Sequence, residues 1–457
     1  MQQVEIKQIL SRQRSFFQSG KTRSIDFRLA QLKKLRQAIE SLEGEITAAL
    51  RRDLGKSDFE AYTSEVGIVY EELSLVAANL PTWSRPQHVS TPLAYQPSFS
   101  TVHPQPRGVV LIIAPWNYPF QLLFAPLIGA IAAGNCIVLK PSELAPATTA
   151  VMSKLIERTF SPEYCALIEG GVSETTALLE EQFDHIFFTG SIPVGKIVMR
   201  AAAEHLTSVT LELGGKSPCI VDADTNLKVT ARRIAWGKFF NCGQTCVAPD
   251  YLLVPRQIKR ELLALIKQSV QEFYGANPQE SPDYGHIINE RHFDRLLALI
   301  SGEVVLGGSH DRSKLYIAPT VIDQVKMEDK VMEDEIFGPI LPVLEYDTLD
   351  DAFAMVRQRP NPLACYVFSN RRATEERVIN ELSFGGGCVN NALIHVGNAH
   401  LPFGGIGASG MGNYHGQHSF LTFSHQKAIT KTPFMLDLPL KYPPYKNKVK
   451  LARKIIG

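Results

Sequence analysis

The chain has 457 residues, of which 45% are hydrophobic and 20% charged, and its formal net charge is +1. This length predicts about two or three domains, and the near-neutral charge argues against a nucleic-acid-binding surface, which needs a strong basic excess. Seven cysteines in so long a chain do not indicate a disulfide framework, the start has mixed charges unlike a signal peptide, and no apolar run reaches membrane-spanning length. We therefore expect a cytoplasmic enzyme with reduced thiols.

The first half of the chain alternates between helical and strand patterns. Residues 1–80 are predicted to be helical, because apolar residues recur three and four positions apart, as they do from Phe27 onward. The composition of residues 81–107 predicts short strands or an extended arm. Buried strands are expected at 108–114, 136–140, 164–168 and 185–191, with helices over 122–133 and 147–160. Such alternation is typical of a parallel sheet in an α/β domain.

A second α/β pattern runs over residues 210–390, and glycine-rich loops and a basic tail follow it. No acidic residue follows Asp437, whereas lysines and arginines recur to the end of the chain. A tail of this kind either contacts anionic lipid or remains a solvated run of charge, and we expect the second.

Two turns predict contacts with a nucleotide. Residues 187–196 close a predicted strand and open a helix, and they carry Gly190 and Gly195 without the complete G-x-G-x-x-G pattern. Glycines let the backbone approach a pyrophosphate, and free N–H groups at a helix start can bind it. Lys140 and Glu143 follow another predicted strand, at the sheet edge where α/β domains bind ligands, and both could reach ribose hydroxyls. Each turn taken alone is equally compatible with ordinary loop structure.

Three side chains have the chemistry of covalent catalysis on a carbonyl. Cys246 lies among small and polar residues, as at the start of a helix, and is a candidate nucleophile if its pKa is lowered or a base is near. Glu212 ends an apolar strand, where burial raises the pKa of a carboxylate and suits it to be a general base; the alternative is a carboxylate paired with a lysine. Asn117, between prolines and aromatic residues, is either an oxyanion donor or a turn residue.

The other cysteines do not indicate a metal site. Cys242 precedes Cys246 closely, but no matching Cys or His pair occurs, so zinc is not expected. Glu335 and Phe337, in a Gly-Pro turn, provide either a further ribose contact or loop structure. The remaining cysteines lie in apolar or glycine-rich segments and are predicted to pack in the interior: Cys136, Cys165, Cys219, Cys365 and Cys388.

Taken together, these segments resemble the aldehyde dehydrogenase superfamily over nearly the whole chain. The motifs occur in the family's order at residues 115–120 (PWNYPF), 140–143 (KPSE), 188–191 (FTGS), 211–216 (LELGGK), 241–246 (NCGQTC) and 335–339 (EIFGP). The short N-terminus and residues 409–416, 420–425 and 441–445 resemble the class 3 branch, which includes the fatty aldehyde dehydrogenases. The apolar C-terminal anchor frequent in that branch is replaced here by the basic tail, so stable membrane insertion is not expected.

The resemblance implies an α/β fold with a Rossmann-type cofactor domain, an α/β catalytic domain and a small β bridging arm used in oligomerisation. On this basis residues 1–80 and 107–209 bind NAD or NADP, residues 210–390 form the catalytic domain, and residues 81–106 and 391–457 form bridging and oligomerisation segments. The class 3 branch further implies a homodimer.

The same resemblance assigns roles by motif. Cys246 is the expected nucleophile, Glu212 the base that activates water, and Asn117, with the backbone N–H of Cys246, the oxyanion site. The expected cofactor contacts are Trp116, Lys140, Glu143, Thr189, Gly190, Ser191, Gly195, Gly214, Glu335 and Phe337. Glu143 would bind the 2′-hydroxyl of NAD and repel a 2′-phosphate unless it rotates or Lys140 offsets it, so NAD is expected to work and NADP to be possible.

The predicted reaction is oxidation of an aldehyde to a carboxylic acid through a thiohemiacetal and a thioester, with medium- to long-chain aliphatic or aromatic aldehydes as substrates. One alternative is a CoA-acylating dehydrogenase, in which CoA rather than water takes the acyl group; Glu212 argues against it. Another is a non-catalytic binding or structural protein on the same fold, and the complete Cys, Glu and Asn set argues against that.

Overall fold

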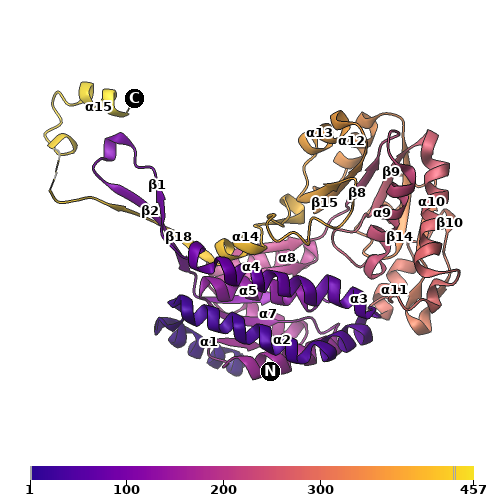
Figure 1. Cartoon of the computed structure of the whole chain (residues 1–457), viewed down its shortest axis with the longest axis horizontal. Helices are drawn as coiled ribbons and strands as arrows, with labels where there is room; N and C mark the ends of the chain where they lie inside the picture. Colours follow the sequence, from indigo (N-terminus) through magenta and orange to yellow (C-terminus); the bar gives the residue numbers. More distant parts are fainter. Residues whose placement is uncertain (1–2, 436, 438, 457) are drawn as a thin grey trace.

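The computed structural model describes residues 3–435, 437 and 439–456, and two mainly parallel sheets form its body (Figure 1). The first sheet has the order β17-β7-β6-β3-β4-β5, and only β17 runs antiparallel to its neighbour. Its strands are β3 (Val109–Ile113), β4 (Cys136–Lys140), β5 (Cys165–Leu167), β6 (His185–Gly190), β7 (Ser208–Leu213) and β17 (Gly410–Met411). The predicted buried strands and the parallel sheet are thus confirmed.

Helices predicted from the apolar spacing of the first 80 residues pack around this sheet. In α2 (Ile25–Leu54) the buried residues recur three or four positions apart, Ser24 accepts a hydrogen bond from the backbone N–H of Phe27 at the start, and Gly55 ends the helix with φ 70°. The other helices of this half are α1 (Gln3–Gln18), α3 (Asp58–Ala61), α4 (Gly67–Trp83), α5 (Gln121–Ala133), α6 (Pro146–Thr159), α7 (Val172–Leu179), α8 (Ile192–Glu204) and α14 (Gly416–Thr422). A π-helical turn, η2 (Tyr62–Val66), joins α3 to α4.

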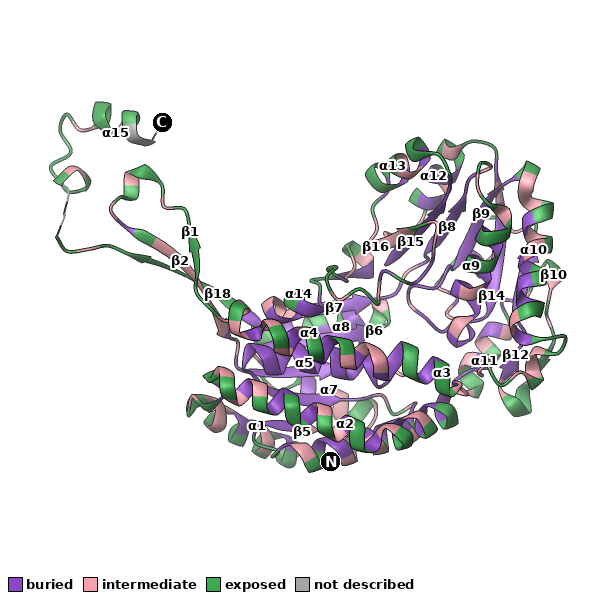
Figure 2. Ribbon diagram, in the orientation of Figure 1, coloured by how far each residue is buried: buried purple, intermediate pink, exposed green. Residues whose placement is uncertain are grey.

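The second sheet has the order β10-β13-β14-β9-β8-β15-β16, and only β10 is antiparallel. Its central strands are buried along their length, as Figure 2 shows. The strands are β8 (Pro218–Val221), β9 (Tyr251–Pro255), β10 (Glu303–Leu306), β13 (Thr320–Asp323), β14 (Ile340–Tyr346), β15 (Ala364–Phe368) and β16 (Gly386–Val389). Helices α9 (Leu227–Phe239), α10 (Arg256–Tyr274), α12 (Leu349–Arg357) and α13 (Arg372–Glu381) pack against them.

An antiparallel arm extends away from the body (Figure 1). It consists of β1 (Gln87–Val89), β2 (Phe99–Pro106) and β18 (Ser424–Lys431), with β18 paired along the full length of β2. The extended arm predicted for residues 81–107 is therefore present. The basic tail includes a short helix, α15 (Val449–Ile456), which lies against the tip of this arm.

Two segments cross the boundaries expected from the sequence. Strand β7 belongs to the first sheet, so the boundary expected between residues 209 and 210 falls inside a strand. Strand β17 also joins this sheet and α14 packs on α4 and α5, so part of 391–457 belongs to the first body. Within the described residues, no helix is both long and apolar enough to cross a bilayer.

Candidate active site

The candidate residues come from loops of the two sheets that face each other. Asn117 follows the carboxyl end of β3, and Glu212 lies near the carboxyl end of β7. From the second sheet, Cys246 lies in the loop before β9, and Glu335 lies in the loop before β14. Hydrogen bonds cross between the two sets of loops, as from the side-chain amide of Asn117 to the carbonyl of Gln244. The site thus forms at the carboxyl edge of the first sheet, where open α/β sheets bind ligands.

Cys246 lies in a tight turn, so the predicted helix start is wrong. The loop leaves α9 through η4 (Phe240–Gly243), where Asn241 and Cys242 adopt positive φ angles of 51° and 52°. A hydrogen bond of 3.0 Å from the Ala248 N–H to the Thr245 carbonyl then closes a turn around the thiol. This backbone leaves Cys246 half-buried, whereas its loop neighbours are buried, so the thiol remains accessible.

The electrostatic environment holds the Cys246 thiol protonated at rest. Burial raises its pKa, the negative charges of Glu335 and Glu212 raise it further, and nearby backbone N–H groups oppose the shift only in part. A low resting pKa was one of two conditions for a nucleophile, and the thiol does not meet it. The other condition, a base within range, rests on Glu212.

Glu212 is a buried carboxylate without a hydrogen-bond partner. Its side chain is 2% exposed, and neither carboxylate oxygen has a protein partner among the described residues. Burial raises its pKa well above the ordinary range, as expected for the end of an apolar strand. The alternative of a structural carboxylate paired with lysine does not apply. Because its pKa is raised, Glu212 is a stronger base than an ordinary carboxylate once it has lost its own proton.

Asn117 is held rigidly in the buried loop after β3. Its side-chain amide donates to the carbonyl of Gln244 at 3.0 Å, and its own carbonyl accepts from Lys56 at 3.1 Å and from Asn241 at 2.9 Å. A carboxamide has two N–H donors, so this amide can make one further hydrogen bond. The role of Asn117 as an oxyanion donor stays a prediction, and the amide has an N–H available for it.

The predicted ribose-binding pair lies together at the end of β4. The Lys140 ammonium donates to the Pro141 carbonyl at 2.6 Å and lies 3.8 Å from the Glu143 carboxylate. Lys140 is buried, and desolvation lowers its pKa, whereas Glu143 is half-exposed and can change its rotamer. This geometry suits a lysine fixed toward one hydroxyl beside a carboxylate that can adapt.

The predicted phosphate-binding turn leads from β6 into α8. Thr189 has a buried hydroxyl without a partner, and Ser191 is the N-cap of α8 but makes no side-chain cap hydrogen bond. The helix start packs closely on β7, because a Cβ at Gly195 would lie 2.6 Å from the end of the Leu213 side chain. The unpaired donors and close packing fit a nucleotide phosphate at this helix start.

Glu335 and Phe337 lie on a loop that is held in place by hydrogen bonds to Lys216 and Asp250. Lys216 donates to Asp250 at 2.7 Å and to the carbonyl of Asp334, and Asp250 accepts from the backbone N–H of Ile336. Burial and the nearby Asp250 raise the pKa of Glu335 to about 8. Gly214 allows the close approach of this loop, because a Cβ there would lie 1.9 Å from the Glu335 carboxylate.

Aromatic rings line the same region. Trp116 lies edge-on to Phe337 with ring centroids 5.3 Å apart, and His292 lies 5.0 Å from Trp116 on α11 (Glu290–Leu297). His292 was not anticipated, because a single histidine in a helical segment carries no signal. The predicted pair Trp116 and Phe337 is therefore brought together from opposite sheets, in an edge-to-face contact.

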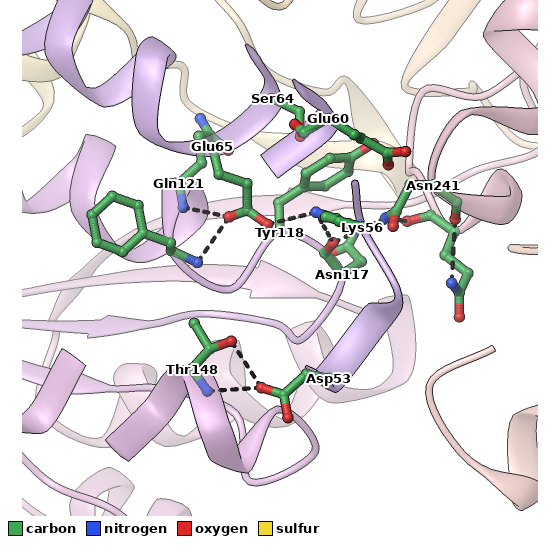
Figure 3. A network of polar contacts seen from close by, with 12 residues as sticks. Asp53, Lys56, Glu60, Ser64, Glu65, Asn117, Tyr118, Gln121, Thr148 and Asn241 are labelled. Carbon is green, nitrogen blue, oxygen red and sulfur yellow. Dashed lines mark hydrogen bonds and ion pairs between the residues drawn. The ribbon is translucent and has the colours of Figure 1, made fainter. Parts of the chain in front are cut away.

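A polar network behind the site was also missed (Figure 3). Lys56 forms a buried ion pair with Glu65, and Tyr118 contacts the hydroxyl of Thr245 at 2.6 Å. Gln244 lies within a predicted motif and anchors the catalytic loop through the carbonyl of His286 and the N–H of Ile288. Only proximity to a motif could have indicated such residues, and Lys56 and Glu65 have none.

The remaining cysteines pack largely as predicted. Cys136, Cys165, Cys219 and Cys365 are buried, as is Cys242. Cys388 differs, because it is only half-buried and its sulfur lies 3.4 Å from Nδ1 of His395. The prediction of a fully buried packing residue is wrong for this position, since β16 is only partly covered.

Comparison with known proteins identifies the family of this chain. The family model described as the aldehyde dehydrogenase family matches residues 1–429. The chain belongs to the aldehyde dehydrogenase family. It is thus an NAD(P)-dependent oxidoreductase that converts aldehydes to carboxylic acids, and the resemblance read from the motifs is confirmed.

Three relatives illustrate the match to this family. The chain is 50% identical over 443 residues to a 4,4′-diaponeurosporen-aldehyde dehydrogenase of Staphylococcus aureus, covering 96% of each chain. It is 48% identical to aldehyde dehydrogenase family 3 member A2 of Macaca fascicularis, with 95% and 90% covered. It is 45% identical to a dimeric NADP-preferring aldehyde dehydrogenase of Canis lupus familiaris, with 96% and 98% covered. The family 3 name of the Macaca fascicularis relative agrees with the predicted resemblance to the class 3 branch.

Solved structures of aldehyde dehydrogenases share the fold. A substrate-bound state of Staphylococcus aureus AldH superposes with a TM-score of 0.97 at 49% identity, covering 99% of each chain. An indole-3-acetaldehyde dehydrogenase in complex with NAD⁺ superposes with a TM-score of 0.86 at 28% identity, covering 94% of this chain and 89% of the other. The predicted α/β fold of this family is confirmed.

Proposed function

We propose that Cys246, Glu212 and Asn117 carry out aldehyde oxidation in this chain. Cys246 adds to the aldehyde carbonyl, Asn117 and the backbone N–H of Cys246 stabilise the oxyanion, and Glu212 activates the water that hydrolyses the thioester. The observation that carries this proposal is the buried, partnerless Glu212 carboxylate beside the half-buried thiol. A free base in this position suits transfer of the acyl group to water, which disfavours the CoA-acylating alternative.

We propose that NAD or NADP binds along the carboxyl edge of the first sheet. When bound, the nicotinamide accepts the hydride that the thiohemiacetal releases. Lys140 and Glu143 would hold the adenosine ribose, and residues 189–195 would lie beside the pyrophosphate. Glu335 would hold the nicotinamide ribose, and Trp116, Gly214 and Phe337 would shape the space around the ring. The exposed Glu143 side chain beside the buried Lys140 supports use of both cofactors, as do relatives named for NAD⁺ or NADP.

We propose medium- to long-chain aldehydes as substrates, with aromatic aldehydes as a second group. A cavity of about 610 Å³ lies between η2, α4 and residues 397–400. Its lining includes Tyr62, Ile68 and Leu75, and it contains none of the three catalytic residues. The proposed place of the hydrocarbon chain is this cavity, because η2 forms one of its walls and Glu65 on η2 accepts a hydrogen bond from the backbone N–H of Phe120, in the loop that carries Asn117.

We propose a cytoplasmic homodimer with separate functional parts. The first sheet and its helices would bind the cofactor, the second would supply the nucleophile, and the exposed arm with residues up to 457 would bridge two copies. The arm's exposed strands and the relative named as dimeric support this arrangement. All seven cysteines are free thiols in the described part of the chain, which supports a reducing compartment.

The first test is cofactor reduction followed by absorbance, with NAD and NADP separately, over aldehydes of increasing chain length. Reduction that rises with chain length and disappears in Cys246→Ala is the expected result. Reduction only when CoA is added would instead support the acylating alternative. Absence of reduction under both conditions, with intact folding, would contradict the proposed chemistry and favour a binding protein.

A further inference from the structure

Lys56 is a buried lysine that has no role in the proposed steps of aldehyde oxidation. It lies in the short connection between α2 and α3, and its side chain is 1% exposed. Its ammonium forms an ion pair with Glu65 on η2, whose side chain is 0% exposed. Buried ion pairs are weak evidence for stability, because desolvation offsets most of the attraction. The other hydrogen bonds of Lys56 and Glu65 indicate a second role for this pair.

Glu65 ties the pair to the start of helix α5. One carboxylate oxygen accepts hydrogen bonds from the backbone N–H groups of Phe120, at 3.0 Å, and of Gln121, at 2.9 Å. These N–H groups have no partner within the helix, and a carboxylate at a helix N-terminus is favourable. Asp53 caps α6 in a similar way through the backbone N–H of Thr148, as Figure 3 shows. Glu65 therefore fixes the downstream end of the loop that carries Asn117.

Lys56 holds the same loop at its centre. Its ammonium donates to the carbonyl of Asn117 at 3.1 Å and lies 4.0 Å from the centroid of the Tyr118 ring. The hydroxyl of Tyr118 in turn lies 2.6 Å from that of Thr245, the residue before Cys246. Figure 3 shows the Lys56 ammonium close to Glu65, Asn117 and the Tyr118 ring. One ammonium group thus contacts the oxyanion loop and, through Tyr118, the nucleophile loop.

We propose that Lys56 is a positioning residue for aldehyde oxidation. By holding the Asn117 carbonyl and the Tyr118 ring, it keeps the Asn117 side-chain amide where the oxyanion develops. Asn241 shares the Asn117 carbonyl at 2.9 Å, but it belongs to the nucleophile loop. Lys56 thus fixes the loop that carries Asn117 relative to helices α2 and α3 beside the first sheet. The inference rests on the proposed role of Asn117 as the oxyanion donor.

The test compares two variants that differ in one donor group. Lys56→Met/Glu65→Gln removes both buried charges and the donor to the Asn117 carbonyl. Lys56→Gln/Glu65→Gln also removes both charges but keeps an amide donor on a side chain of similar size to methionine. In both, the glutamine at position 65 can still accept from the helix start. Lys259→Met, which removes a lysine paired with Asp323 and Glu345 outside the site, controls for loss of a lysine.

We expect the methionine variant to lose about 10- to 100-fold in kcat, since misplacement by about 1 Å can cost about 100-fold. Its KM for NAD and the rate at which iodoacetamide alkylates Cys246 should stay within about twofold. The glutamine variant should exceed the methionine variant in kcat by at least about fivefold. Both should melt within a few degrees of each other, and Lys259→Met should keep its kcat within about twofold.

Combining these variants with Asn117→Ala distinguishes the positioning role of Lys56 from the oxyanion role of Asn117. In an Asn117→Ala background, replacing the pair by methionine and glutamine should change kcat by less than about twofold, because the group being positioned is gone. Equal kcat values for the two variants, or the same loss in the Asn117→Ala background, would overturn the positioning role. Full activity of Asn117→Ala alone would instead overturn the oxyanion role that the inference assumes. Melting curves of every variant show whether a loss of kcat reflects unfolding.

Discussion

Replacing Glu212 by glutamine tests the proposed base through both stability and kinetics. In the native protein neither Glu212 oxygen has a partner in the described structure, and burial raises its pKa well above the ordinary range. The folded state therefore binds the proton to a higher pH than the unfolded state. Below about pH 4 both states are protonated and the group has no effect on the free energy of unfolding; as pH rises toward and through the folded-state pKa, stability falls.

The magnitude follows from the missing partners. Leaving a buried polar group unsatisfied costs about 1–3 kcal/mol, and more when it is charged. Because a glutamine is buried in the same place but cannot ionise, Glu212→Gln should match the native protein at about pH 4 and below. Near pH 9 it should exceed the stability of the native protein by about 1–3 kcal/mol, the extra cost of the buried charge. The same variant should release about one reduced cofactor per site in a burst and then turn over about 100- to 10,000-fold more slowly, as expected when a general base is lost.

The assay pairs thermal unfolding at several pH values with stopped-flow absorbance. Glu45→Gln, which neutralises an exposed carboxylate paired with Lys154, provides the matched control and should show no pH-dependent gain. A stability gain that is constant from pH 5 to pH 9 would refute the ionisation argument. Normal steady-state turnover in Glu212→Gln would refute the role of this residue as the base.

Three further outcomes follow from the same geometry. Asn117→Ala should lower kcat by about 100- to 1,000-fold without impairing NAD binding, because a preorganised oxyanion donor is lost; cofactor titration and turnover distinguish the two effects. Glu143→Ala should shift the NADP-to-NAD ratio of kcat/KM about tenfold toward NADP, about 1.4 kcal/mol, because Lys140 then faces a 2′-phosphate without a competing carboxylate. Ile68→Trp should raise KM for long-chain aldehydes several-fold but leave that for propanal unchanged, if the cavity beside α4 holds the chain.

The strands and helices followed from local patterns because burial on both faces leaves a continuous apolar run, as in β3 and β4. The candidate site residues could be proposed for the same reason, because each family motif is a short continuous segment that can be recognised from residue type and order alone. The turn around Cys246 could not, because its positive φ angles at Asn241 and Cys242 depend on contacts with another sheet. The role of Lys56 could not be predicted either, because Lys56 belongs to no motif and its partners are Glu65 on η2 and the Asn117 carbonyl after β3.

Several buried polar atoms at the site have no hydrogen-bond partner among the described residues. Polar atoms without partners among the described residues include the Thr189 hydroxyl, both oxygens of Glu212, and the amide oxygens of Asn117 and Asn241. Away from the site, Asp222 is engaged by Arg371, Ser369 and Thr374. Other buried atoms there have no partner, as in Gln13, Thr22 and Tyr164. Buried polar groups in folded proteins are nearly always paired, so an unpaired set at one edge of a sheet calls for partners from outside the chain. Substrate, water and cofactor are the groups that aldehyde oxidation brings there, and Lys56 with Glu65 keeps the loop of Asn117 ready to receive them.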